Sequence, residues 1–170
     1  MAETTKNRPV SRAERALTEE QALGIVRAVP HCVLSTCDAA GVPYGMPVTP
    51  VLLDGALYFH GTARPESRRR ENLLANPEVS LCFVAKDKTL SEQYSVDYAS
   101  AIVAGRAFLV TDEAEREKAI RAIIARHAPG NDPAANEATI TNALPVTQIW
   151  RVEIERITGK ARCGAKGWKA

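Results

Sequence analysis

The sequence lacks closely spaced metal ligands and the short motifs that mark common nucleotide sites. Its 4 cysteines and 3 histidines are scattered, with no Cys-x-x-Cys pair, whereas zinc sites require closer ligand pairing. It contains no Gly-x-Gly-x-x-Gly, no Walker motif and no Gly-x-Ser-x-Gly elbow. We therefore predict no metal site. Cys32, Cys37 and Cys82 lie in apolar runs and are expected to pack as small hydrophobic residues.

The sequence also lacks a strong charge imbalance and a long apolar run. It has 22 Lys and Arg against 20 Asp and Glu, for a net charge of +2, which is too little for a general nucleic-acid binder. No apolar run reaches the length of a membrane span, and the polar start has no signal-peptide core. We expect a cytoplasmic protein with no nucleic-acid or membrane partner. At 170 residues we expect one domain over residues 17–162, an N-terminal arm over 1–16 and a basic tail over 163–170 that carries Cys163.

Strand-like runs outnumber helical ones along the chain. Strands are expected over residues 31–37, 42–53, 56–60, 78–86, 98–110 and 147–157. Helices are expected after the capping box at 18–21, over 66–75 and after Thr111-Asp112, with loops over 87–96 and 128–137. Because hairpins dominate and no βαβα alternation occurs, we predict a mainly β (α+β) fold, an antiparallel barrel with peripheral helices.

Two features of the strands indicate where a ligand could bind. Asp54-Gly55 suits a tight hairpin turn between two apolar runs. The run before it contains Pro43, Pro47 and Pro50. Proline cannot donate to a strand ladder and favours edges and bulges, so this interrupted strand leaves backbone groups free to face a ligand. Gly105, in the longest strand, predicts a bulge or bend.

The segment Ser67-Arg68-Arg69-Arg70 is the sharpest local signal. Arginines at a helix start can fork onto phosphate oxygens, and the free amides of the first turn add to such a site. Consecutive helix positions turn by about 100°, so all three arginines cannot reach one ligand. Arg70 lies one turn before Leu73 and Leu74 and is expected to lean toward their face. A phosphate site for one or two of the arginines and a solvated helix face both remain open.

His60 ends a strand immediately before Gly61. It could donate a proton to a redox substrate, form a wall of a pocket, or simply pack with one backbone hydrogen bond. The residue alone does not choose between these roles.

Several segments, taken in order, resemble one protein family. ESRRRENLLANPEVSLCFVA, with VPYGMPVTP and LYFHG before it and SAIVAGRAFLVTD and ITGK after it, resembles the FMN-binding split-barrel family, the pyridoxamine 5′-phosphate oxidase-like proteins. The block over residues 33–84 is most similar to the nitroimidazole-resistance branch. The resemblance spans residues 17–162 by motif order and spacing, and it implies a six-stranded antiparallel split β-barrel with peripheral helices.

The resemblance also implies a cofactor and its site. Proteins of this family bind FMN non-covalently in a homodimer, with the cofactor at the subunit interface. By position, the backbone of Met46, Pro47, Val48 and Thr49 would follow the isoalloxazine. Phe59 and His60, at a strand end, would lie beside the ring or ribityl chain. Ser67, Arg68 and Arg69, at a helix start, would bind the phosphate, and Ser100 would contact the flavin across the dimer.

The activity that we expect differs from the oxidation of pyridoxamine phosphate for which the family is named. The Arg-containing C-terminal motif that holds the substrate phosphate in true pyridoxamine phosphate oxidases is not found in the ending ARCGAKGWKA, so vitamin B6 oxidation is not expected. We expect a flavin-dependent reductase of small electron-poor acceptors such as 5-nitroimidazoles, with His60 as the catalytic candidate and NAD(P)H as the candidate donor. The alternatives are a non-catalytic flavin-binding or storage protein, and a haem-binding split barrel with His60 or His31 as axial ligand.

Overall fold

The structure is a computed structural model, and it describes residues 8–162. The expected tail over 163–170, Cys163 included, and the first seven residues of the expected arm lie outside the described residues.

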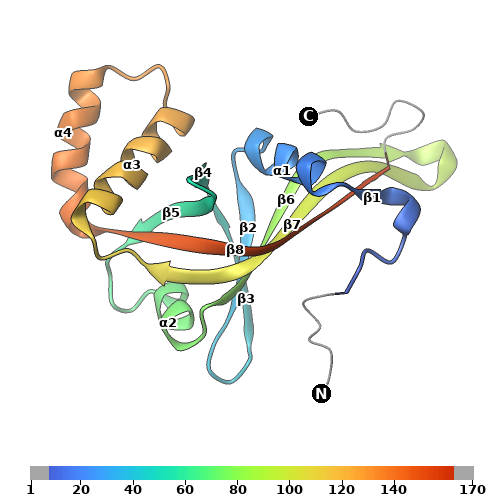
Figure 1. Cartoon of the computed structure of the whole chain (residues 1–170), viewed down its shortest axis with the longest axis horizontal. Coiled ribbons are helices and arrows are strands. Elements are labelled where there is room, and N and C mark those ends of the chain that lie inside the picture. The colour runs from blue at the N-terminus through green and yellow to red at the C-terminus, as the bar shows by residue number, and fades with distance from the viewer. Residues whose placement is uncertain (1–7, 163–170) are drawn as a thin grey trace.

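Within residues 8–162 the strands form one 8-stranded sheet in which every pairing is antiparallel (Figure 1). The order along the sheet is β3-β2-β6-β7-β8-β5-β4, with β1 on β8. The strands are β1 (Ala16–Leu17), β2 (Cys32–Cys37), β3 (Pro43–Val48), β4 (Val51–Leu53), β5 (Ala56–Thr62), β6 (Glu78–Leu90), β7 (Ser95–Leu109) and β8 (Thr147–Arg162). The predicted mainly β, antiparallel architecture is confirmed.

The two ends of this sheet are consecutive in sequence. Edge strands β3 and β4 are separated only by Thr49 and Pro50, so the opposite edges come close together and the sheet curls into a half-barrel. The strand count of six was wrong because the run over 42–53 does not form one strand. It breaks at Thr49-Pro50, where proline cannot continue a ladder, and the short β1 adds one further pairing.

Two expected loops are also regular structure. β6 and β7 continue through 87–96 as a long hairpin, interrupted only by the turn at Ser91–Gln93 and the left-handed Tyr94. In the second loop a helix begins at Pro133, where Asp132 accepts a hydrogen bond from the Ala135 amide at 3.0 Å. An aspartate cap followed by proline in the first turn is a helix-start signal, which the Pro- and Asn-rich composition concealed.

Four α-helices lie around the sheet in the described chain. α1 (Glu19–Ala28) begins with both halves of the predicted capping box, Thr18 and Gln21. α3 (Glu113–His127) is capped by Asp112. The others are α2 (Arg68–Ala75) and α4 (Pro133–Ala143), with 3-10 turns η2 (Ala13–Arg15), η3 (Ser91–Gln93) and η4 (Leu144–Val146). Figure 1 shows α3 and α4 together at one end of the molecule and α2 apart from them.

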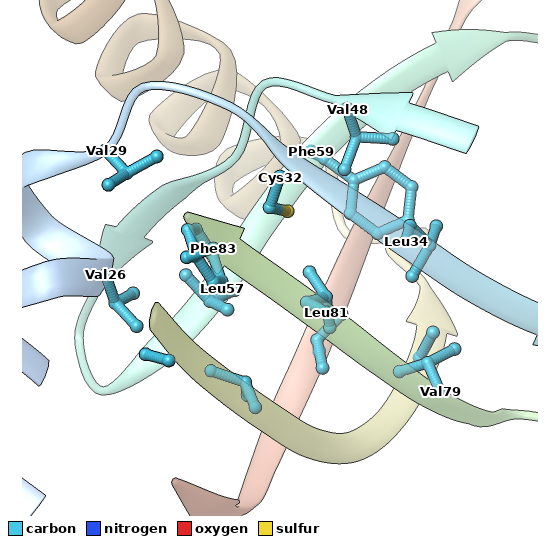
Figure 2. Packing of buried hydrophobic residues seen from close by; sticks show 14 of the residues in the cluster. Val26, Val29, Cys32, Leu34, Val48, Leu57, Phe59, Val79, Leu81 and Phe83 are labelled. Carbon is cyan, nitrogen blue, oxygen red and sulfur yellow. The ribbon is translucent and has the colours of Figure 1, made fainter. Parts of the chain in front are cut away.

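The hydrophobic core has two parts that meet at strands β5 and β8. The larger part fills the half-barrel under α1, and Figure 2 shows Leu34, Phe59, Leu81 and Phe83 inside it. The smaller part packs the opposite face of β5 and β8 against α3 and α4. Neighbouring residues of β5 therefore serve different cores, which fixes the direction of each side chain at the end of this strand.

Two local predictions about the strands are confirmed. The β4–β5 hairpin turns at Asp54 and Gly55, both with positive φ (50° and 81°), as a primed hairpin turn requires. The β7–β8 register shifts between Ala104 and Gly105, where the bulge was expected. No helix within the described residues is long and apolar enough to cross a membrane.

Candidate functional site

The buried face of α2 determines which of its arginines points at the barrel. Asn72 and Leu73 are buried (2% and 3% exposed), whereas Leu74 is 54% exposed. The expectation that Leu73 and Leu74 form the inner face was therefore wrong by one position. Residues three and four apart share a helix face, so Arg69 is the arginine that lies directly over the buried pair.

Hydrogen bonds hold α2 against the sheet. The Asn72 side-chain amide donates to the Thr36 hydroxyl at 2.9 Å, and that hydroxyl donates to the Tyr44 carbonyl at 3.2 Å. At the helix end, the Asn76 amide lies 3.2 Å from Cys37 Sγ. Sequence reasoning missed Asn72. Its signal is a polar residue one turn after an arginine on the inner face, a position where a hydrophobic residue is the ordinary choice.

Arg69 reaches the inner face of β5. Its guanidinium carbon lies 5.7 Å from the centre of the Phe59 ring. The guanidinium also occupies the space above Gly61, where the Cβ of any other residue would overlap Arg69 Nη2. Glycine at position 61 is therefore required for this placement, because it alone leaves the room.

The Arg69 guanidinium lacks a counter-ion in the described chain. Its Nε is buried and without a hydrogen-bond partner, and no carboxylate of residues 8–162 lies within 4.0 Å of it. Burial lowers the pKa of Arg69, while Tyr44 opposes that shift. A half-buried cation without a partner is costly, so this position favours an anionic ligand.

The other two residues of the predicted phosphate segment lie beside Arg69. Arg68 stacks on the Tyr44 ring of β3, with 4.5 Å between the guanidinium carbon and the ring centre. Ser67 is the N-cap of α2, and its hydroxyl makes no capping hydrogen bond with any described residue. Ser67, Arg68, Arg69 and the first amides of α2 thus surround one helix start between β3 and β5, an arrangement suited to a phosphate.

Strand β3 offers its backbone beside this helix start. It pairs with β2 and with no other described strand, so one of its edges has free ladder groups. Met46 is half-buried, Val48 is buried, and Pro47 and Thr49 are exposed. The ladder groups on the open edge of β3 are the backbone groups of this segment that can contact a ligand. The isoalloxazine contact of the four residues stays a prediction.

His60 lies on the opposite face of β5 from Phe59 and Gly61. It pairs with Ile149, which belongs to the core under α3, and its side chain is exposed. Partial desolvation of the ring lowers the pKa of His60, and electrostatic interaction with Arg69 and His127 lowers it further. The imidazole is thus harder to protonate than a free one, and within one chain it does not share a face with the Arg69 guanidinium. No group of three potential metal ligands occurs among the described residues.

Ser100 is separate from this site within one chain. It lies on the outward face of β7, paired with Val84 and Lys160. On the same face, register aligns Val33 of β2 with Cys82 of β6 and Ile102 of β7. We call Val33, Val84 and Ile102, which are 46%, 54% and 37% exposed, the outer apolar patch.

An antiparallel half-barrel whose two edge strands meet beside an arginine-bearing helix defines a split-barrel protein. Residues 18–161 match the model of the family described as pyridoxamine 5′-phosphate oxidase. The chain belongs to this family, which confirms the assignment made from its motifs. No curated protein shows significant similarity to the sequence.

Solved structures share this fold at low sequence identity. A protein from Bacteroides thetaiotaomicron named for 5-nitroimidazole antibiotic resistance is 22% identical, with a TM-score of 0.69 and 85% of each chain covered. A flavocytochrome from Azotobacter vinelandii is 20% identical, with a TM-score of 0.73, covering 95% of this chain and 75% of that one. An FAD- and haem-binding protein from Mycobacterium smegmatis is 20% identical, with a TM-score of 0.68, covering 90% and 74%. At these identities the likeness shows the fold alone.

Proposed function

We propose that the protein is an FMN-binding oxidoreductase that reduces small electron-poor acceptors such as 5-nitroimidazoles. The observation that carries the proposal is the half-buried Arg69 guanidinium, which has no counter-ion within residues 8–162 and lies between the open edge of β3 and the end of β5. A phosphate-bearing ligand with a flat ring system fits both parts of this arrangement. The phosphate would neutralise the arginine, and the ring would lie along the strand edge.

The residues present fit FMN by the chemistry of their donors. Arg69 would fork onto the phosphate from the floor of the site, and Arg68, held by Tyr44, would contribute a second positive charge. The Ser67 hydroxyl and the first α2 amides would donate to the remaining oxygens. The backbone of Met46, Pro47, Val48 and Thr49 would pair with the edge of the isoalloxazine. When bound, FMN would supply the electron transfer, while the protein orients the ring and limits access to it.

We also propose that the functional form is a homodimer. The outer apolar patch exposes aliphatic side chains on a regular sheet face, and such patches mark interaction sites. Ser100 lies on the same face, so a second copy seated there would bring this serine to its partner's flavin. A site shared between two copies is consistent with the outward direction of Ser100 on β7.

The proposed acceptors are nitro compounds and the proposed donor is NAD(P)H. A structural neighbour named for 5-nitroimidazole resistance makes nitroimidazoles the first acceptors to test, with NAD(P)H as donor. The surroundings of His60 lower its pKa, so as a proton donor it would have to be protonated against this shift. If it is the proton donor, His60→Phe should retain FMN but reduce nitroimidazoles about 100-fold more slowly in stopped-flow oxidation of the prereduced protein. Unchanged rates at saturating acceptor would leave His60 a wall of the pocket.

The phosphate assignment can be tested with two neighbouring arginines. Arg69→Ala should weaken FMN binding by roughly 10- to 100-fold, because a lost charge-assisted hydrogen bond costs on the order of 1.5–3 kcal/mol. Arg70→Ala is the matched control. Its Nε is also buried and unpaired, but Arg69 is the arginine placed over Phe59 and Gly61, so Arg70→Ala should retain most of the affinity. Fluorescence titration of apo-protein with FMN gives both constants. Equal affinity in Arg69→Ala and the parent would refute the assignment.

A haem-binding split barrel is the second candidate, since two structural neighbours are named for haem binding or as a flavocytochrome. The exposed His60, whose lowered pKa favours the metal-binding neutral imidazole, is the candidate axial ligand. The absorption spectrum of the purified protein separates the two candidates, because a Soret band indicates haem and two broad bands in the blue and near ultraviolet indicate flavin. A flavin spectrum without turnover of NAD(P)H and nitro compounds would indicate a flavin-binding or storage protein.

A further inference from the structure

Gln148 lies opposite the glycine that makes room for Arg69. In the β5–β8 register Gly61 pairs with Gln148 and Phe59 pairs with Trp150. Opposed residues of an antiparallel pair point to the same face, with Cβ positions roughly 4.5–5.5 Å apart. Because Arg69 Nη2 fills the Cβ position of Gly61, the Gln148 side chain starts within about one side-chain length of the guanidinium.

The polar groups of this face lack partners in the described chain. Three buried polar atoms have no hydrogen-bond partner: the acceptor Gln148 Oε1 and the donors Arg69 Nε and Trp150 Nε1. An unpaired buried polar atom costs about 1–3 kcal/mol. An unpaired acceptor and an unpaired cationic donor on one face can satisfy each other.

Packing does not enclose Gln148 on every side. It borders a cavity of about 280 Å³ whose lining includes Leu109 and Arg116 but not Arg69. The cavity leaves the side chain space to change rotamer. The β5–β8 register, rather than the cavity, brings the carboxamide near the guanidinium, and rotation about its three side-chain torsions would turn Oε1 toward Arg69.

We propose that Gln148 is a positioning residue of the anion site, whose carboxamide oxygen accepts a hydrogen bond from the Arg69 guanidinium and holds it toward the bound phosphate. This rests on the proposed function, since the phosphate is that of the flavin. A neutral acceptor suits the role better than a carboxylate, because it orients the arginine without neutralising it. The guanidinium keeps its full charge for the ligand.

The test compares ligands with and without a phosphate. Dissociation constants for FMN, riboflavin and inorganic phosphate are measured by titration of the wild-type protein, Gln148→Met, Arg69→Met and the double variant. Gln148→Leu serves as a second variant should Gln148→Met fail to fold. Thr147→Val is the control, because Thr147 borders the same cavity but its side chain alternates to the other face of β8 from Gln148. Thermal denaturation establishes that each variant is folded.

We expect Gln148→Met to raise the dissociation constant for FMN by about tenfold and to leave that for riboflavin unchanged. The double variant should bind FMN no more weakly than Arg69→Met alone, because a residue that acts through Arg69 has nothing left to position. Unchanged FMN affinity in Gln148→Met, an equal loss for FMN and riboflavin, or additive losses in the double variant would overturn the assignment.

Failure of the proposed function gives a different result. If the wild-type protein binds no FMN, the dissociation constants for inorganic phosphate test the role of Gln148. Gln148→Met should then raise the constant for phosphate, and the double variant should bind phosphate no more weakly than Arg69→Met alone. If the wild-type protein binds neither ligand, both proposals are overturned.

Discussion

At the scale of single residues, the placement of Arg69 depends on the absence of a side chain at position 61. We expect Gly61→Ala to weaken FMN binding by roughly tenfold, because the new methyl group displaces the guanidinium from its place over β5. Folding should change little, since the displaced atoms are the far end of a flexible side chain. Titration with FMN and a thermal melt measure the two effects. Gly130→Ala, where an added Cβ meets nothing within 4 Å, is the control, and full FMN affinity in Gly61→Ala would contradict the role of this glycine.

The lowered pKa of His60 predicts how the stability of the protein depends on pH. Its pKa in the folded protein is below the ordinary value of 6.5, chiefly through desolvation. His60 therefore binds a proton more readily in the unfolded chain than in the folded protein. Its protonation does not lower the free energy of unfolding above about pH 6.5, and it lowers that free energy increasingly as the pH falls below this value. We expect the free energy of unfolding, measured in urea, to fall less between pH 8 and pH 5.5 in His60→Gln than in the wild-type protein. Parallel pH profiles would show that His60 is not the group responsible.

The sequence identifies the arginine cluster but not the arginine that faces the barrel. Ser67-Arg68-Arg69-Arg70 shows where a phosphate site could form, and helical geometry excludes a joint role for all three arginines. The choice among them depends on which side of α2 is buried. That side is set by Asn72, a polar residue whose hydrogen bond to Thr36 is a tertiary contact that hydropathy does not record.

At the scale of elements, α2 depends on this buried polar contact. Asn72→Ala should destabilise the protein by about 1–3 kcal/mol, because it removes a buried hydrogen bond and leaves a small void against the Thr36 hydroxyl. Leu74→Ala, on the exposed side of the same helix, should change stability by less than about 0.5 kcal/mol. Urea denaturation of both variants provides the comparison. Equal effects would show that the hydrogen bond does not anchor α2.

Sequence patterns located most elements, and the failures have different causes. The Thr18–Gln21 capping box, the Asp54-Gly55 turn and the Gly105 bulge are local signals, and the structure confirms each of them. The strand break at Thr49-Pro50 depends on pairing between distant segments, whereas the hairpin through 87–96 is a local pairing that lacks a sequence signal. The polar residues of that hairpin alternate too weakly to indicate strands, and the ladder between β6 and β7 supplies the stabilisation that their side chains do not.

At the scale of the whole molecule, the outer apolar patch predicts the oligomeric state. The wild-type protein should be a dimer in light scattering at micromolar concentration. Ile102→Lys places a charge in the patch and should shift the mass toward the monomer while weakening FMN binding. Val146→Lys, at a residue that is 66% exposed on η4, is the control and should remain dimeric. A monomeric wild-type protein that still holds flavin would contradict the homodimer.

The order of strands in the sheet has a consequence for how the protein is made. β5 is synthesised early, but its partner across most of its length is β8, the last strand, and α1 packs on β7 and β8 as well. During translation the first half of the chain therefore leaves the ribosome with an incomplete sheet and an uncovered helix. Domains whose pairings are this distant fold slowly and expose apolar surface while incomplete. Nascent chains of this protein should remain protease-sensitive, and dependent on ribosome-associated chaperones, until β8 has emerged from the exit tunnel.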